Sequence, residues 1–141
     1  MELEPGSVRW LHVVVAALAT FLLGGLWYTA LFGKLWQRLH GYSDEKLEEM
    51  RKLHPPPVFF GVMLFSYLLL ALVCELCFRA LAIDTALEGA QFGFLLWLGV
   101  AFAIGLTAWI ASDKPFGACA LDLAYQLAFL VMTGAILAGW R

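Results

Sequence analysis

The sequence predicts an all-α, polytopic membrane protein with four transmembrane helices in one bundle. Of its 141 residues, 62% are hydrophobic and 14% are charged, whereas soluble domains are about half apolar and a quarter charged. A chain of this length keeps much of its surface outside any core, so the excess of apolar side chains requires lipid as solvent. Four stretches without Asp, Glu, Lys or Arg, at 10–33, 55–74, 89–112 and 123–140, each approach the roughly 20 residues that a spanning helix needs.

The first span is predicted at residues 8–32. The tripeptide at 17–19 resembles a signal-peptide cleavage site, but a signal peptide has a basic start and a short apolar core. Here the leader carries Glu2 and Glu4, and the apolar sequence continues well past the tripeptide. We therefore expect this segment to be a helix of the mature protein.

The segment at 33–57 is the long connection of the chain and is predicted to be an amphipathic helical loop. Its first part, 34–39, mixes basic and apolar residues and is expected to lie in the membrane interface. Ser43 is placed to cap a short helix at 44–53, whose first turn holds acids that favour a helix N-terminus. The prolines at 55–57 fit the first turn of the next span.

The remaining spans are predicted at 58–82, 86–112 and 116–139, so the connections between them are tight turns. Asp84 is the expected N-terminal cap of the third span. Together with the first span and the loop, these helices form one membrane domain over residues 1–141.

Small residues recur four apart in these spans. Ala16, Thr20 and Gly24 stand at this spacing in the first span, and Gly89 and Gly93 in the third. Residues four apart share one helix face, and small ones let two backbones approach closely. The pattern therefore supports a packed bundle.

The distribution of Lys and Arg predicts the orientation, because cytoplasmic loops carry an excess of both. The loops after spans 1 and 3 hold Lys34, Arg38, Lys46, Arg51, Lys52 and Lys114. The opposite side holds Arg9, Arg79 and Arg141. This difference predicts termini on the periplasmic or outer side and the 33–57 loop in the cytoplasm.

Ionisable residues inside the spans are candidate functional groups, since each costs about 2.5–3.5 kcal/mol on insertion scales. Under the predicted topology they form two layers. The outer layer, nearer the termini, contains His12, Glu75, Arg79, Glu88 and Gln91. Glu75 and Arg79 lie four apart and can pair on one helix face.

Two interpretations of the outer layer remain open. It is a proton or ion pathway or a ligand site with Glu75 as the key acid, or it is a neutralised pair that fixes helix packing. In the second case Glu88 favours the N-terminus of span 3 electrostatically, and His12 is interfacial. A metal site would need three helices to converge without a local ligand motif, so no metal centre is predicted.

The inner layer centres on Asp122, about two turns into span 4. Tyr125 and Gln126 follow on the same face, Lys34 could snorkel towards the carboxylate, and Tyr28 lies at the same depth. One interpretation is a carboxylate that binds a cation or a polar headgroup, or that relays protons. The other is a structural role, in which Asp122 accepts a hydrogen bond from Tyr28 or caps a helix end.

The sequence does not favour an enzyme. It contains no P-loop, no HExxH and no Gly-x-Ser-x-Gly, and it indicates no cofactor. The net charge of −2 does not point to a nucleic-acid partner. Cys74, Cys77 and Cys119 all fall in apolar runs and are interpreted as packing residues.

Two motifs carry a family resemblance. Residues 25–36, Gly-Leu-Trp-Tyr-Thr-Ala-Leu-Phe-Gly-Lys-Leu-Trp, resemble the first-helix signature of the bacterial Domain of Unknown Function 1761 family, approximately Gly-x-Trp-Tyr-Ser-Pro-x-x-Phe-Gly-Lys-x-Trp. Residues 122–126 and 132–140 are similar to its last helix. The resemblance implies a four-span bacterial inner-membrane protein and brings no established activity.

The chain departs from the family pattern in two places. Thr29-Ala30 stands where Ser-Pro is usual, which removes the proline that would break helix 1. Gln126 stands where a histidine is often found, which weakens a metal or proton-relay role for span 4.

The function predicted from the sequence is that of a multi-pass inner-membrane protein that binds or passes a small polar or ionic ligand through intramembrane carboxylates. The alternative is a membrane interaction or assembly protein whose polar residues are structural. Four helices seldom enclose a pathway, so ligand passage predicts a homodimer. The lipid bilayer is the other expected partner.

Overall fold

The computed structural model describes residues 5–140, which contain helices, turns and no strand. Residues 1–4 and 141 lie outside the described part, and with them Glu2, Glu4 and Arg141 from the charge arguments. The helical elements in chain order are η1 (Pro5–Ser7), α1 (Trp10–Leu26), η2 (Trp27–Leu31), α2 (Gly33–His40), α3 (Asp44–Leu53), α4 (Pro56–Leu81), α5 (Ala86–Leu96), η3 (Trp97–Phe102), α6 (Ala103–Ile110) and α7 (Phe116–Gly139).

Four continuous helical segments are long and apolar enough to cross a membrane. They are Trp10–Leu31, Pro56–Leu81, Ala86–Ile110 and Phe116–Gly139. The all-α fold with four such helices is thereby confirmed, and α2 and α3 supply the expected helical loop between the first two. Each bound lies within two residues of the expected one.

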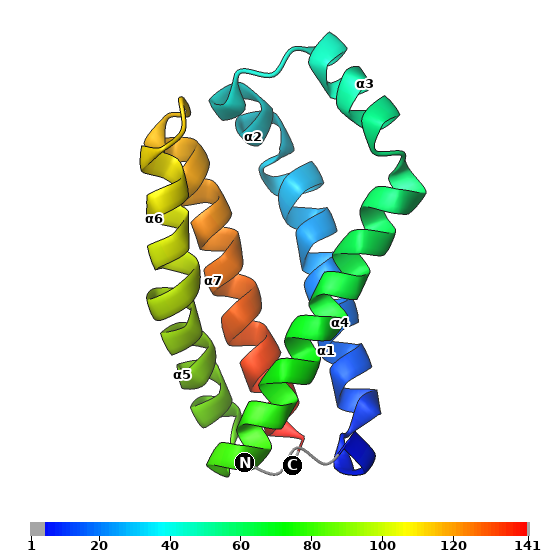
Figure 1. Ribbon diagram of the computed structural model, residues 1–141, viewed down its shortest axis with the longest axis vertical. Coiled ribbons are helices and arrows are strands. Elements are labelled where there is room, and N and C mark those ends of the chain that lie inside the picture. Colours follow the sequence, from blue (N-terminus) through cyan, green and yellow to red (C-terminus); the bar gives the residue numbers. More distant parts are fainter. Residues whose placement is uncertain (1–4, 141) are drawn as a thin grey trace.

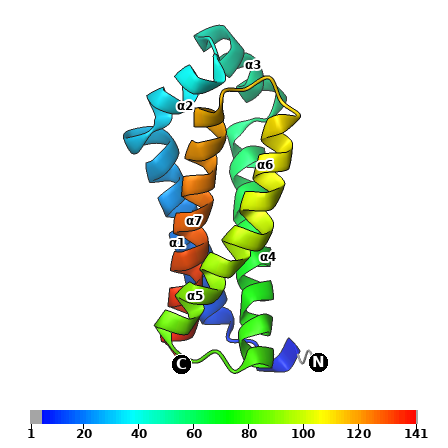
Figure 2. The same ribbon diagram turned by 90° about the vertical axis from the view of Figure 1, so that its left-hand side faces the viewer.

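The bundle has two distinct ends (Figure 1). One end holds η1, the last turn of α7 and the α4–α5 turn, and we call it the terminal end. The other holds α2, α3 and the α6–α7 turn, and we call it the loop end. The α5–η3–α6 segment runs beside α7 in both views (Figures 1 and 2), while α1 packs against α4 and α7.

The backbones of α5 and α7 approach each other closely at two glycines. A Cβ added at Gly89 would overlap the carbonyl oxygen of Gly134, and a Cβ at Gly134 would overlap that of Gly89. Gly93 meets the backbone of Leu130 one turn further along. Only residues without a side chain allow this backbone approach, which is the packing that the spacing of small residues predicts.

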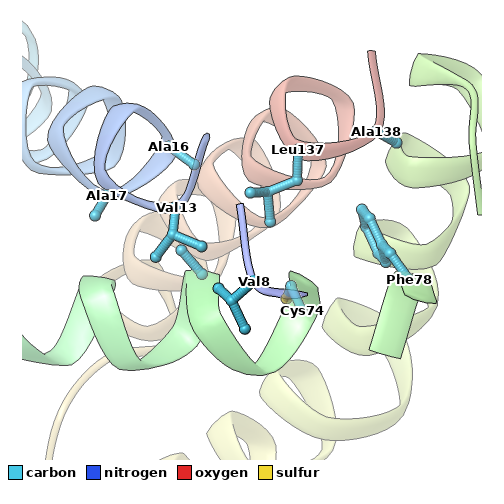
Figure 3. Packing of buried hydrophobic residues seen from close by; sticks show 9 residues of the cluster. Val8, Val13, Ala16, Ala17, Cys74, Phe78, Leu137 and Ala138 are labelled. Atoms are coloured by element: carbon cyan, nitrogen blue, oxygen red, sulfur yellow. The ribbon is translucent and has the colours of Figure 1, made fainter. Parts of the chain in front are cut away.

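The apolar core lies in the half of the bundle nearer the terminal end. It combines Val8 and residues of α1, α4 and α7, as Figure 3 shows; its members are Val8, Val13, Ala16, Ala17, Ala71, Cys74, Phe78, Leu137 and Ala138. By contrast, none of the described residues of η2, α2 and α3 is buried. At the loop end the buried apolar side chains come from α7 and include Ala118, Leu121 and Leu123.

The outward faces of α4, α5 and α6 are apolar. Phe65 and Leu69 on α4, Leu95 on α5, and Ile104 and Ile110 on α6 are more than half exposed. So many large apolar side chains on one surface are suited to lipid contact.

Two helix caps were predicted, and one of them is corrected. The Ser43 hydroxyl accepts the Lys46 amide at 3.1 Å and caps α3 as expected. The cap of α5 is Thr85 and not Asp84: Thr85 accepts the Glu88 amide, and the Glu88 carboxylate accepts the Thr85 amide. This reciprocal pair satisfies two amides at the helix start, so Glu88 is a capping residue.

The first span ends in a π-helical turn, η2, although residues 27–33 contain no proline. The Phe32 amide donates to the Trp27 carbonyl, and Phe32 leaves the helical region at φ −128°. The Thr29 hydroxyl donates to the Gly25 carbonyl one turn earlier, a bond that bends helices. The direction change into α2 therefore needs no proline.

Candidate functional site

At the loop end, one oxygen of the Asp122 carboxylate accepts a hydrogen bond and the other does not. Asp122 projects from α7, and its Oδ1 accepts the Tyr28 hydroxyl of η2 at 2.6 Å. The Asp122 side chain keeps 37% of its surface exposed. The Tyr28–Asp122 bond is the contact expected under the structural interpretation of the inner layer, and it leaves Oδ2 available.

The open side of Asp122 faces α2. Nε2 of His40 lies 3.9 Å from Asp122 Oδ2, beyond the reach of a direct hydrogen bond. The His40 ring is stacked with Tyr42, at 5.2 Å between centroids, and tilted against Trp36 at 4.5 Å. The Lys114 ammonium donates to the His40 carbonyl at 3.1 Å, so α2 is tied to the α6–α7 turn.

Aromatic rings continue from this carboxylate into the bundle. Tyr28 and Tyr125 meet edge to face, with centroids 5.1 Å apart. The Tyr125 hydroxyl shares a 2.8 Å hydrogen bond with Tyr67 of α4 and donates to the Thr20 carbonyl of α1 at 3.1 Å. A Cβ on Gly24 would lie 2.6 Å from the Tyr125 hydroxyl, so a glycine is needed for this join of three helices.

Most buried polar atoms without a hydrogen-bond partner in the described chain lie near this end. They are Trp27 Nε1, both ring nitrogens of His40, and Gln126 Oε1; the fifth, His12 Nδ1, is at the terminal end. Each such atom costs roughly 1–3 kcal/mol when it stays unsatisfied. An orphaned donor or acceptor in a native fold is commonly explained by a water or an ion.

The terminal end has a carboxylate whose two oxygens are both bonded. Glu75 of α4 is fully buried, and Arg9 donates from Nε to Oε1 at 3.0 Å and from Nη2 to Oε2 at 3.1 Å. The same Nη2 donates to the Leu137 carbonyl of α7 at 3.1 Å. Arg9 therefore links three helices with one guanidinium, a bidentate geometry that adds both strength and specificity.

The other outer-layer candidates do not gather around Glu75. Arg79 donates to the Ser7 hydroxyl, Glu88 caps α5, and Gln91 is exposed. His12 packs edge to face on Trp140 at 5.0 Å. The structure thus divides this layer into separate local contacts.

The inner-layer candidates come together more closely. Tyr28, Asp122 and Tyr125 are in contact, and Gln126 follows them on α7. Lys34 instead lies on the exposed face of α2, and the contacts of Asp122 come from Tyr28 and His40.

Sequence reasoning missed three important residues: Arg9, His40 and Tyr67. In the sequence, Arg9 contributes only to the distribution of Lys and Arg that predicts the orientation. Trp36 and His40 stand four apart on an amphipathic helix, which was the available signal for an aromatic face turned towards the bundle.

The described residues hold no group of three or more His, Cys, Asp or Glu side chains that could bind a metal ion. Cys74, Cys77 and Cys119 are free thiols. Around Asp122 the structure offers one partly exposed carboxylate, a histidine and several aromatic rings.

The chain belongs to the family described as protein of unknown function (DUF1761), whose model matches residues 11–138. This confirms the resemblance carried by the motifs at 25–36 and 122–126. Comparisons with curated proteins and with solved structures gave no match.

Proposed function

Starting from membership of this family, we propose that the protein binds a small cation at its loop end, with Asp122 as the countercharge. The observation that supports the proposal is that only one of the two oxygens of this carboxylate accepts a hydrogen bond. Tyr28 fixes Oδ1 at 2.6 Å, while Oδ2 lies 3.9 Å from the nearest His40 nitrogen and the side chain stays 37% exposed.

The cost of such a group supports a role beyond packing. A carboxylate within a spanning helix is expensive and usually pairs with another group or lines a water-filled path. Glu75 meets this requirement through Arg9, whereas Asp122 has one neutral hydroxyl and a histidine beyond hydrogen-bond distance. A bound cation would supply the missing charge.

The surroundings favour a cation over an anion. The rings of Tyr28, Trp36 and Tyr42 form one aromatic cluster with His40. Aromatic faces attract cations, and the Lys114 ammonium lies over the Tyr42 ring, 4.8 Å from its centroid. The unpaired Gln126 Oε1, one turn after Asp122, adds a second acceptor. Either a hydrated monovalent ion or a small ammonium compound fits this chemistry.

We further propose that the protein resides in the bacterial inner membrane with the loop end in the cytoplasm. The excess of Lys and Arg at that end supports this orientation. If the cation crosses the bilayer, a second copy of the chain is needed, because the half nearer the terminal end is filled by apolar side chains.

Ligand-dependent stability of the detergent-purified full chain tests the proposal. Sodium, potassium, ammonium and tetramethylammonium chlorides would be titrated while the midpoint of thermal unfolding is followed. A ligand that binds the folded state raises this midpoint in a concentration-dependent way. We expect one of the cations to stabilise the wild type and to lose its effect in Asp122→Asn. Equal responses of the two proteins to every salt would refute the proposal.

The alternative is an interaction or assembly protein, and the Arg9–Glu75 link favours it for the terminal end, where the polar groups hold the helices together. Under this alternative, Asp122→Asn changes oligomeric size or partner retention in size-exclusion chromatography, with no change in cation response.

A further inference from the structure

The short helix α2 has two chemically different faces. Trp36, Leu39 and His40 are partly buried: Trp36 contacts Tyr28 and His40, and Leu39 packs next to Gly117 of α7. Lys34, Leu35 and Arg38 are exposed and lie within about 100° of each other on a helix of 3.6 residues per turn.

The two basic residues of the exposed face differ from most other cations at the loop end. Lys46, Arg51 and Lys114 lie 3.5 Å, 3.6 Å and 4.0 Å from carboxylates of Glu49, Glu48 and Asp113. Among residues 5–140, no carboxylate pairs with Lys34, Arg38 or Lys52. Of these three, only Lys34 and Arg38 stand one helical turn apart.

The position of α2 determines how deep Lys34 and Arg38 lie relative to the apolar layer. The first apolar segment ends at Leu31, and α2 begins two residues later. Lys34 therefore lies at the boundary between the apolar layer and water, with the exposed Leu35 beside it. Basic residues in an amphipathic helix at this level attract anionic phospholipids.

We infer that Lys34 and Arg38 form a binding site for the phosphate of an anionic phospholipid headgroup. The guanidinium and the ammonium are each suited to one phosphate oxygen, and the apolar side chain of Leu35 contacts the start of the acyl chains. The site is separate from the Asp122 cation site, since it uses the opposite face of α2.

Native mass spectrometry of the full chain, released from detergent with defined lipids, tests this inference. The probes are phosphatidylglycerol and phosphatidylcholine with identical acyl chains. Each basic residue near an anionic surface contributes roughly a fivefold gain in binding. We therefore expect a clear phosphatidylglycerol preference in the wild type, reduced by about 25-fold in Lys34→Gln/Arg38→Gln, which is about fivefold for each residue.

The matched control is Lys46→Gln/Arg51→Gln, which removes the same charge from cations that are already paired. It should keep the preference, and so should the charge-conserving Lys34→Arg/Arg38→Lys. Equal losses in both Gln variants would show attraction by net charge alone and would overturn the inference. Absence of a preference in the wild type, or displacement of the lipid by soluble glycerol phosphate, would also overturn it.

A lost preference counts only for a folded variant. Size-exclusion elution and the thermal midpoint of each variant are therefore compared with those of the wild type. Because both side chains are exposed, we expect neither to change. If Lys34→Gln/Arg38→Gln is unstable, the single variants replace it, and at least one must show the loss.

Discussion

At the terminal end Glu75 is fully buried and both its oxygens accept hydrogen bonds from Arg9, whereas at the loop end Asp122 is partly exposed and accepts one hydrogen bond from a neutral tyrosine. The apolar core surrounds the first carboxylate, and orphaned polar atoms lie around the second. Two acids in spanning helices of one bundle thus meet opposite environments. An intramembrane carboxylate is therefore a candidate for ligand binding only where the fold leaves it without a charged partner.

The largest loss of stability is expected from Arg9→Ala, which removes the ion pair with Glu75 at the terminal end. Removing one partner of a buried ion pair typically costs 3–5 kcal/mol, and we expect about 3 kcal/mol because Arg9 itself is partly exposed. Unfolding in detergent by a chemical denaturant measures this loss. Arg9→Met/Glu75→Leu should recover most of the stability, since apolar residues can replace a buried pair. If Arg9→Ala unfolds like the wild type, the link does not hold the three helices.

The glycine contact between α5 and α7 comes next. Gly134→Ala adds a Cβ that overlaps the Gly89 carbonyl, and overpacking costs about 1–3 kcal/mol. The matched control is Gly61→Ala on α4, where nothing lies within 4 Å of the new Cβ. There we expect a gain of roughly 0.5–1 kcal/mol, because alanine is the better helix former. Opposite shifts of the thermal midpoint would verify the contact, and equal shifts would contradict it.

Tyr125→Phe tests the hydrogen bonds that connect α7 with α1 and α4 between the two ends of the bundle. It removes the hydrogen bonds to Tyr67 and to the Thr20 carbonyl and should cost about 1–2 kcal/mol. In the Tyr67→Phe/Tyr125→Phe double variant, the second substitution should cost less than it does alone, because no hydroxyl is then left without its partner. Additive losses in this double-mutant cycle would mean that the two tyrosines act independently.

The smallest effect on stability is expected from Asp122→Asn. The amide oxygen can still accept the Tyr28 hydroxyl, and the site is partly exposed, so the loss should stay below about 1 kcal/mol. Glu75→Gln, measured beside it by size-exclusion chromatography and thermal unfolding, removes a charge from a closed pair and should be clearly less stable. Equal destabilisation of the two variants would remove the distinction between the two ends.

Local sequence signals predicted the helices well. Uncharged runs located the four spans, Ser43 located the start of α3, and the glycines at 89 and 93 indicated close helix packing without identifying α7 as the partner. Each of these features depends on residues that are close together in the sequence. The cap of α5 shows the limit, because Asp84 and Thr85 are adjacent and both are good caps.

The partners of the charged residues were harder to predict. Glu75 and Arg79 share a helix face, yet the partner that encloses Glu75 is Arg9, 66 residues earlier in the chain. His40 likewise approaches Asp122 only because α2 folds back onto α7. Such pairs depend on how helices are arranged in space, which the periodicity of a single helix does not contain.

One continuous helical segment connects the two polar clusters, since Arg9 immediately precedes the Trp10–Leu31 segment and Tyr28 lies near its end. At 1.5 Å per residue these two residues are about 28 Å apart along the axis, close to the roughly 30 Å hydrocarbon thickness of a bilayer. Hydrophobic mismatch would therefore act directly on α1: a thicker membrane would draw its polar anchors inwards, and a thinner one would tilt it. An ion pair and a tyrosine–carboxylate bond thus lie at the two ends of a segment whose length is close to the hydrocarbon thickness of a bilayer.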